Sequence, residues 1–262
     1  MISSAQNQYV KLYRSLERRK VRMEQWLLPL EGENLVRDAV ERQVGPEVIY
    51  LRQGLSVEHF PFLQGLANKL TVLSIEEKLF DRTAFTESPQ GILAVVRRPV
   101  VQLADIFRQQ PALLLVVDGV QDPGNLGTML RSAAAAGAGG VILLPGTVDA
   151  TNPKALRAAM GAYLALPVVD VQPDRCLAEL RRHRIPLVTA DSGADTSYEQ
   201  FNWVGAAAVV IGNEGAGVSA ALASAADKKV SIPMVGAVES LNAAIAMSVI
   251  FFEAARQRRQ GS

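Results

Sequence analysis

The amino-acid sequence predicts an α/β protein in which a mostly parallel sheet, covered by helices on both faces, follows a small α/β domain. Short apolar segments rich in Val, Ile and Leu alternate with helical patterns in the C-terminal part. Such strands are typical of a sheet that is buried on both faces. Composition changes at Arg97-Arg98-Pro99 and at Gln109-Gln110-Pro111. We therefore expect domains at residues 1–100 and 113–262, joined by a linker at 101–112.

The overall composition indicates a globular protein. Of 262 residues, 49% are hydrophobic and 20% are charged, and no apolar run approaches the ~20 residues that cross a bilayer. The N-terminus lacks the apolar core of a secretory signal, so we expect a cytoplasmic protein. A single cysteine excludes an internal disulfide, and with only two histidines beside it we expect no metal site.

The first domain begins with a basic amphipathic segment. Residues 3–22 show helical spacing, with two tyrosines and two leucines on one face and six basic residues against one acidic residue on the rest. This face suits a phosphate backbone, although a solvated charged surface explains it equally well. The candidate RNA-binding residues are Lys11, Arg14, Arg18, Arg19 and Arg22. Further along we expect strands at 26–30, 48–51, 71–74 and 91–96 and helical segments at 35–42 and 62–70.

The second domain shows a regular strand-then-helix order. Its apolar segments predict strands at 113–117, 141–144, 166–169, 187–190, 207–211 and 230–232. Helices are expected at 126–136, 153–163, 176–184 and 218–225, and a last helix from Leu241 carries Ile245, Val249 and Phe252 at helical spacing. The order predicts parallel strands.

Ligands of such sheets bind beyond the carboxyl ends of the strands, which directs attention to three loops. In the first, Asp118–Thr128, Pro123-Gly124 favours a tight turn, Asn125 can cap a helix, and Arg131 follows about one turn later. An ordinary turn with a solvent-facing arginine is the alternative. The nucleotide-binding Gly-x-Gly-x-x-Gly and Gly-Lys-Ser/Thr patterns are missing from the three loops.

The other two loops carry glycines beside polar residues. Three glycines in Gly212–Gly217 expose backbone groups around one carboxylate, Glu214. The third loop, Met234–Asn242, joins the last strand to the last helix, and its plainest interpretation is that Gly236 turns the chain and Ser240 caps the helix.

Together and in this order, the three loops resemble the signature motifs of the SpoU/TrmH branch of SPOUT RNA 2′-O-ribose methyltransferases. The resemblance covers residues 113–262. The N-terminal part is similar to the small RNA-binding domain that precedes the catalytic domain in many members, on the basis of the basic helix and of Leu30-Glu31-Gly32-Glu33-Asn34-Leu35-Val36.

The resemblance implies a C-terminal trefoil knot, S-adenosylmethionine as the cofactor, and a homodimer through the C-terminal domain with the active site completed across the interface. It implies that the backbone at Gly212, Ile232 and Leu241 holds the cofactor. Ile211, Gly217 and Met234 are expected to line the same pocket.

By the same resemblance, Arg131 is tied to activation of the ribose hydroxyl. Asn125, Glu214, Ser240 and Asn242 are expected to shape and orient the site. No histidine lies near the loops. A guanidinium stays protonated up to a pKa above ~12, so the sequence leaves open whether Arg131 removes the proton or anchors phosphate and hydroxyl. Residues 243–246 depart from the family pattern, where members often carry valine and serine.

The expected partner is therefore RNA, and within RNA the 23S-type large-subunit rRNA. Transfer RNA as the substrate and a non-catalytic RNA-binding or ribosome-assembly factor on the same scaffold are the alternatives, since function resides in the site rather than in the fold. A metabolite-binding α/β enzyme of another kind is more remote.

Overall fold

The computed structural model describes residues 1–64, 70–191, 193–236 and 240–261. The chain divides into two compact units, one formed by Met1–Val100 with Asp149–Leu164 and one by Val101–Val148 with Ala165–Ser262. Two details differ from the predicted domains. Residues 149–164 join the first unit, where α6 (Pro153–Ala159) packs on β1 (Leu27–Glu31). The predicted linker instead contains a 3-10 helix, Leu103–Phe107, whose Ile106 and Phe107 enter the core of the second unit.

The first unit is built on a four-stranded sheet in the order β1-β4-β2-β3. β2 (Pro46–Arg52) is parallel to β3 (Thr71–Ile75), and β4 (Ile92–Arg97) is antiparallel to its neighbours. α3 (Glu33–Glu41) and α4 (Glu77–Thr83) follow β1 and β3. α4 was not predicted. The predicted helical segment 62–70 is replaced over 61–63 by a 3-10 turn, and residues 65–69 lie outside the described residues.

The basic segment is two helices rather than one. α1 (Gln8–Ser15) and α2 (Arg19–Gln25) are separated at Arg18, whose backbone is extended. The Arg22 side chain turns back and donates hydrogen bonds of 2.7 Å to the carbonyls of Leu16 and Glu17. A guanidinium thus satisfies carbonyls that a continuous helix would have bonded internally.

The predicted helix 153–163 is also divided. α6 ends at Met160, which adopts a left-handed φ of 47°, and Gly161 follows with φ of 82°. A side chain at Gly161 would collide with the Asp38 carboxylate of α3, so the close approach of α3 requires glycine here. α7 (Ala162–Ala165) then continues the chain.

The second unit contains a six-stranded sheet in the order β10-β8-β9-β5-β6-β7, and every pair in it is parallel. Its strands are β5 (Leu113–Asp118), β6 (Gly140–Leu143), β7 (Val168–Asp170), β8 (Leu187–Ala190), β9 (Ala207–Gly212) and β10 (Lys228–Val230). The two central strands are buried along their whole length. This confirms the predicted parallel sheet of the α/β class.

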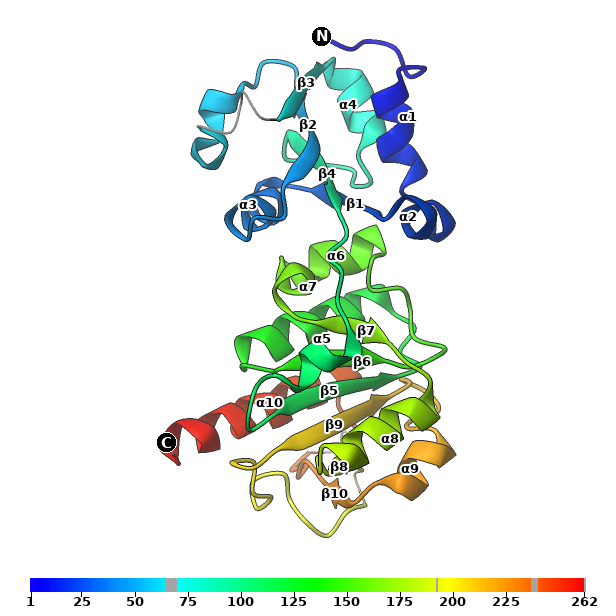
Figure 1. Ribbon diagram of the computed structural model, residues 1–262, viewed down its shortest axis with the longest axis vertical. Coiled ribbons are helices and arrows are strands. Elements are labelled where there is room, and N and C mark those ends of the chain that lie inside the picture. Colours follow the sequence, from blue (N-terminus) through cyan, green and yellow to red (C-terminus); the bar gives the residue numbers. More distant parts are fainter. Residues whose placement is uncertain (65–69, 192, 237–239, 262) are drawn as a thin grey trace. The chain divides into compact units, whose positions relative to one another are not determined.

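Helices cover both faces of this sheet (Figure 1). α8 (Pro173–Arg182) and α9 (Ala220–Ala225) pack on one face, where Leu180 and Leu222 meet Leu114 and Val210. α5 (Pro123–Ala135) and α10 (Ala243–Gln260) pack against each other on the opposite face. α5 follows β5, and α10 is the last helix. Their N-terminal ends therefore lie beside the carboxyl ends of the strands.

Candidate active site

The first loop leads from β5 into α5, and its polar residues are positioned by the helix start. Asp122, not Asn125, is the N-cap, because its carboxylate accepts the backbone N–H of Asn125 at 2.8 Å and Pro123 occupies the first turn. The helix begins three residues earlier than predicted. The Asn125 side chain is consequently available for contacts with other loops.

Asn125 connects all three loops. Its Nδ2 donates to Oε1 of Glu214 at 2.8 Å, and its Oδ1 accepts a hydrogen bond from Nδ2 of Asn242 at 3.0 Å. Asn242 caps α10, since its own Oδ1 accepts the backbone N–H of Ala244 at 2.9 Å. The cap predicted at Ser240 is therefore wrong by two residues. One amide, acting as donor and acceptor, joins residues that are far apart in sequence.

The second loop folds tightly on itself. Asn213 and Gly217 exchange backbone hydrogen bonds of 2.9 Å in both directions, and the Asn213 Oδ1 accepts the N–H groups of Gly215 and Ala216 at 2.9 Å. A side chain at Gly212 would collide with the backbone of Gly217 and Val218. Gly217 has a φ of 71°. Both glycines are required by the backbone geometry.

Two polar residues that the sequence analysis missed fix this loop to the first one. Asn213 Nδ2 donates to the carbonyl of Gly119 at 2.8 Å, and the Asp118 carboxylate accepts the backbone N–H of Ser219 at 2.7 Å. Asp118 is the last residue of β5, and Asn213 directly follows β9. Their position at the carboxyl ends of two central strands could have identified them from the sequence.

A cavity of about 480 Å³ opens between the second and third loops. The predicted residues that line it are Glu214, Gly217, Ile232, Met234, Ser240, Leu241 and Asn242, and the residues missed include Asp191 and Asn213. Ile211 and Gly212 are not among the described residues that line it. They form the end of β9, and Gly212 pairs with Asp118 of β5. The volume falls within the ~300–1,000 Å³ typical of ligand pockets.

Two carboxylates of this cavity stay ionised at neutral pH. Burial raises the pKa of Glu214, but hydrogen bonds from the Asn125 side chain and from the backbone N–H of Gln121 and Asp122 outweigh it and leave the pKa below its usual value. The backbone N–H of Gly193 and the Lys229 ammonium lower the pKa of Asp191. Both therefore act as hydrogen-bond acceptors.

Arg131 lies elsewhere. It is an exposed residue of α5, about 9 Å along the helix from Asn125 at 1.5 Å per residue, and it is not among the described residues that line the cavity. α5 packs against α10 near this level, where Ser248 donates to Ser132 at 2.7 Å. The cavity of a single chain therefore does not account for the role predicted for Arg131.

The candidate RNA-binding residues of the first unit divide into two groups. Lys11, Arg14, Arg18 and Arg19 are exposed, as predicted for a phosphate-binding surface, and Arg14 also donates to the carbonyl of Arg82. Arg22 is only 2% exposed and forms an ion pair with Asp149. Its assignment to RNA binding is wrong, because the guanidinium is used inside the unit.

The described residues contain no cluster of three or more His, Cys, Asp or Glu side chains suited to hold a metal ion. No helix in these ranges is long and apolar enough to cross a membrane.

Three loops meet at the carboxyl ends of a parallel sheet, and a cavity lies beside the hydrogen-bonded side chains of Glu214, Asn125 and Asn242. This arrangement defines a ligand-binding site of the α/β class. Residues 112–252 match the model of the SpoU rRNA methylase family, and residues 7–94 match that of an MRM3-like substrate-binding domain.

Relatives and solved structures agree with these matches. The chain is 34% identical to the 23S rRNA (guanosine(2553)-2'-O)-methyltransferase RlmP of Bacillus subtilis (strain 168), over 96% of this chain and 97% of that one. The SpoU methyltransferase AviRb from Streptomyces viridochromogenes, solved with AdoMet, superposes with a TM-score of 0.86 at 30% identity and covers 97% of this chain and 100% of its own. A solved RNA 2′-O ribose methyltransferase gives a TM-score of 0.84 at 31% identity, covering 98% and 99%.

The chain belongs to the SpoU rRNA methylase family. As the sequence predicted, it is an S-adenosylmethionine-dependent RNA 2′-O-ribose methyltransferase.

Proposed function

We propose that this enzyme methylates a ribose 2′-hydroxyl in 23S-type large-subunit rRNA, that its active site is completed by a second copy of the chain, and that its N-terminal unit binds the RNA. The observation that carries the proposal is the hydrogen-bonded chain from Glu214 through Asn125 to Asn242 beside the cavity. The RlmP relative, whose name states a 23S rRNA substrate, matches both units of this chain. That full-length match favours large-subunit rRNA over transfer RNA.

The cavity suits S-adenosylmethionine. Gly212 cannot carry a side chain because the backbone of Gly217 and Val218 occupies that space, so backbone groups of the second loop are presented directly. Ile232 and Leu241 supply apolar walls next to these polar groups. The backbone N–H and carbonyl groups of Gly212, Ile232 and Leu241 are the proposed adenine and methionine contacts. Ile211, next to Gly212 at the end of β9, is buried. The cofactor supplies an electrophilic methyl group on a sulfonium sulfur.

The remaining polar residues are assigned to the RNA side. Glu214 is an ionised acceptor that fixes the Asn125 amide, and Asn125 in turn fixes Asn242 at the start of α10. Ser240 lies at the same rim of the cavity. These hydrogen-bonded side chains, Glu214, Asn125 and Asn242, position the ribose. Arg131 binds the adjoining phosphate and the hydroxyl through its planar guanidinium.

The homodimer is proposed from the surface of α10. Ile245 and Phe252 are 49% and 48% exposed and lie two turns apart on this helix. Exposed apolar residues that gather on one face mark protein contact sites. Arg131 lies on the neighbouring helix α5 and outside the cavity of its own chain. In the proposed dimer, the second copy covers α10, and one chain's Arg131 completes the other chain's active site.

The trefoil knot and the cytoplasmic location stay predictions. The knot concerns the second and third loops, and residues 237–239 of the third loop lie outside the described residues.

The test of the proposal uses purified protein, labelled S-adenosylmethionine and large-subunit rRNA from cells that lack the gene. We expect transfer of label to a ribose 2′-oxygen and saturable cofactor binding by calorimetry. If the cofactor binds but label is transferred only to transfer RNA, the proposed substrate is wrong and transfer RNA takes its place. Absence of both heat and transfer would favour the non-catalytic RNA-binding factor.

A further inference from the structure

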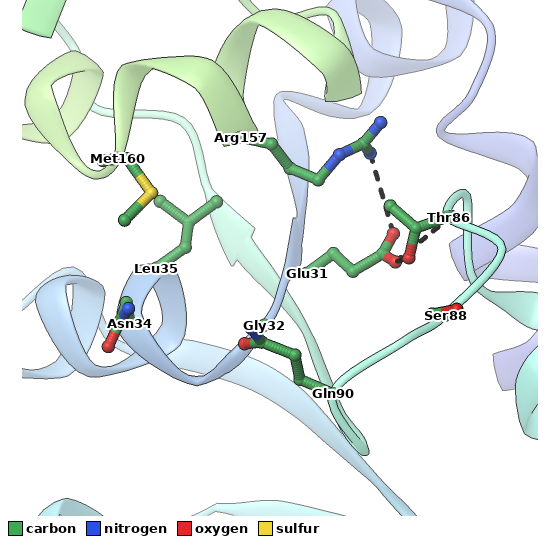
Figure 2. Close-up of a pocket in the computed structure, with 9 residues that line it drawn as sticks. All are labelled: Glu31, Gly32, Asn34, Leu35, Thr86, Ser88, Gln90, Arg157 and Met160. Atoms are coloured by element: carbon green, nitrogen blue, oxygen red, sulfur yellow. Dashed lines mark hydrogen bonds and ion pairs between the residues drawn. The ribbon is translucent and has the colours of Figure 1, made fainter.

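A second pocket lies within the first unit, apart from the three loops of the active site. It has a volume of about 210 Å³ and is formed by the end of β1, the start of α3, the chain at residues 86–90 and the helix α6 (Figure 2). α6 is encoded inside the sequence of the methyltransferase domain, yet its Arg157 and Met160 form a wall of this pocket.

The polar end of the pocket holds a fixed carboxylate and an arginine. Glu31 accepts hydrogen bonds from the backbone N–H groups of Phe85 at 2.9 Å and Thr86 at 3.2 Å, and another from the Thr86 hydroxyl. The Arg157 Nη1 faces this carboxylate at 3.7 Å, beyond hydrogen-bond distance. Among the described residues this buried Nη1 has no hydrogen-bond partner. The ion pair of Arg157 and Glu31 therefore closes the polar end of the pocket.

The opposite end is apolar. Figure 2 shows the Met160 thioether beside the Leu35 side chain. Leu35 is buried, whereas Met160 is 43% exposed. Met160 adopts a left-handed φ of 47° at the end of α6, and Gly161 follows with a φ of 82°. A large exposed apolar side chain on a constrained backbone makes a contact surface for a flat apolar face.

Two amide side chains also line the pocket. Gln90 Oε1 accepts the backbone N–H of Glu33 at 3.1 Å, which leaves the Gln90 amide NH₂ as a donor. Asn34 is exposed in the first turn of α3. Amides donate and accept at once, as reading of a base edge requires. A free phosphate is disfavoured because the Glu31 carboxylate lines the polar end of the pocket.

We propose that this pocket receives one unpaired base of the RNA substrate, stacked against Met160 and Leu35 and hydrogen-bonded by Asn34 and Gln90. The inference rests on the proposed function, because the ligand is part of the same RNA. The volume of about 210 Å³ is below the ~300–1,000 Å³ of pockets for drug-sized ligands, so it suits a single ring system. Proteins that recognise RNA sequence commonly bind bases splayed out of single-stranded loops.

The chain allows a reversible test. Its single cysteine, Cys176, is buried, and burial raises the pKa of its thiol to about 11. A new exposed cysteine is therefore the one reactive thiol at neutral pH. Ser88→Cys places it at the pocket, and Ser3→Cys places a matched one on an exposed serine of the same unit that is not among the described lining residues. Both are labelled with the neutral reagent benzyl methanethiosulfonate, which leaves a benzyl disulfide.

We expect the benzyl group at position 88 to weaken binding of large-subunit rRNA about tenfold, the scale of one base stack. The KM for RNA should rise while kcat at saturating RNA and cofactor affinity stay unchanged, and dithiothreitol should restore binding. The label at position 3 should leave all of these within about twofold. Equal effects of the two labels on an enzyme that methylates rRNA would overturn the pocket assignment. Failure of the unlabelled enzyme to methylate any RNA would instead overturn the proposed function.

Discussion

At the scale of single residues, Asn125 shows how much one side chain contributes to the site. Its amide donates to Glu214 and accepts from Asn242 because Asp122 has already taken the capping position of α5. The sequence placed all three residues in candidate loops but assigned the caps to the wrong neighbours. Ser, Asn and Asp have similar capping preferences, so local sequence does not decide which of them caps.

Arg131 provides the first prediction at this scale. Arg131→Ala should abolish methyl transfer while the Kd for S-adenosylmethionine stays within about threefold, because Arg131 does not line the cofactor cavity of its own chain. Arg131→Lys should stay severely impaired, since an ammonium does not reproduce a bidentate guanidinium. Single-turnover kinetics and calorimetry measure the two quantities. Wild-type transfer by the alanine variant would remove Arg131 from the mechanism.

Arg22 provides the second prediction at the scale of single residues. Its guanidinium pairs with Asp149 and donates to Thr151 at 3.0 Å, and the exposed fractions of the paired side chains are 2% and 14%. Removing one partner of such a pair costs about 3–5 kcal/mol of unfolding free energy, and we expect a loss near the lower limit for Arg22→Ala at pH 7, measured by urea unfolding. Arg19→Ala, at an ion pair of 3.8 Å whose arginine is 64% exposed, is the control and should change little.

The same pair predicts a pH dependence. Burial raises the pKa of Asp149, but hydrogen bonds from Thr151 and Arg22 outweigh it and hold the pKa below its usual value. A carboxyl with a depressed folded pKa stabilises the fold above its unfolded pKa, about 3.9, and this stabilisation is lost as pH falls through the folded value. The stability difference between wild type and Arg22→Ala should therefore shrink below about pH 4. A constant difference down to pH 2 would contradict this linkage.

At the scale of elements, the strands of the second unit were predictable and several helices were not. Buried parallel strands form continuous apolar runs, so β5 and β9 were expected within a residue of their observed ends. The helix 3–22 was wrong because Arg22 bonds the carbonyls of Leu16 and Glu17, a contact that no periodicity shows. The close approach of Asp38 that requires Gly161 is likewise invisible in sequence.

The second loop gives the prediction for an element. Gly212→Ala should weaken S-adenosylmethionine binding by at least about tenfold, since overpacking costs about 1–3 kcal/mol and the displaced atoms are backbone of the loop itself. Gly215→Ala is the matched control, because its Cβ would meet only the Asn213 Oδ1 at an ordinary 3.6 Å. Calorimetry on both variants decides. Equal affinities would show that the loop does not hold the cofactor.

α10 gives another. Ile245→Asp with Phe252→Asp should convert a dimer to a monomer and abolish methyl transfer, while the free energy of unfolding of the isolated chain changes little because both residues are exposed. Val204→Asp, at an apolar side chain that is 40% exposed elsewhere in the unit, is the control. Sedimentation analysis measures the mass. A double variant that stays dimeric would place the interface on another surface.

At the scale of the whole molecule, each of the two units has its own core, and residues 149–164 extend the first one. Sequence order hid this because the segment is flanked on both sides by strands of the parallel sheet, β6 and β7. Local patterns identify elements, but only long-range packing shows which core a helix joins. The exposed basic residues of α1 and α2 remain the candidate RNA surface.

This surface predicts salt-dependent binding. Replacing Arg14, Arg18 and Arg19 by alanine should weaken RNA binding and flatten the slope of log K against log salt by about 0.7–0.9 for each phosphate that the variant no longer neutralises. The corresponding triple lysine variant keeps the charges and should keep the slope. Nitrocellulose filter binding across a salt series measures both. An unchanged slope in the alanine variant would mean that these residues face solvent only.

The central claim is that three loops of one chain form a site that methylates a ribose of large-subunit rRNA. It is tested most directly by mapping 2′-O-methylation across total RNA from cells with the gene, without it, and with the Arg131→Ala variant in its place. The account predicts one large-subunit rRNA position whose methylation disappears on deletion and returns with the wild type but not with the variant. Identical methylation maps in all three strains would contradict it.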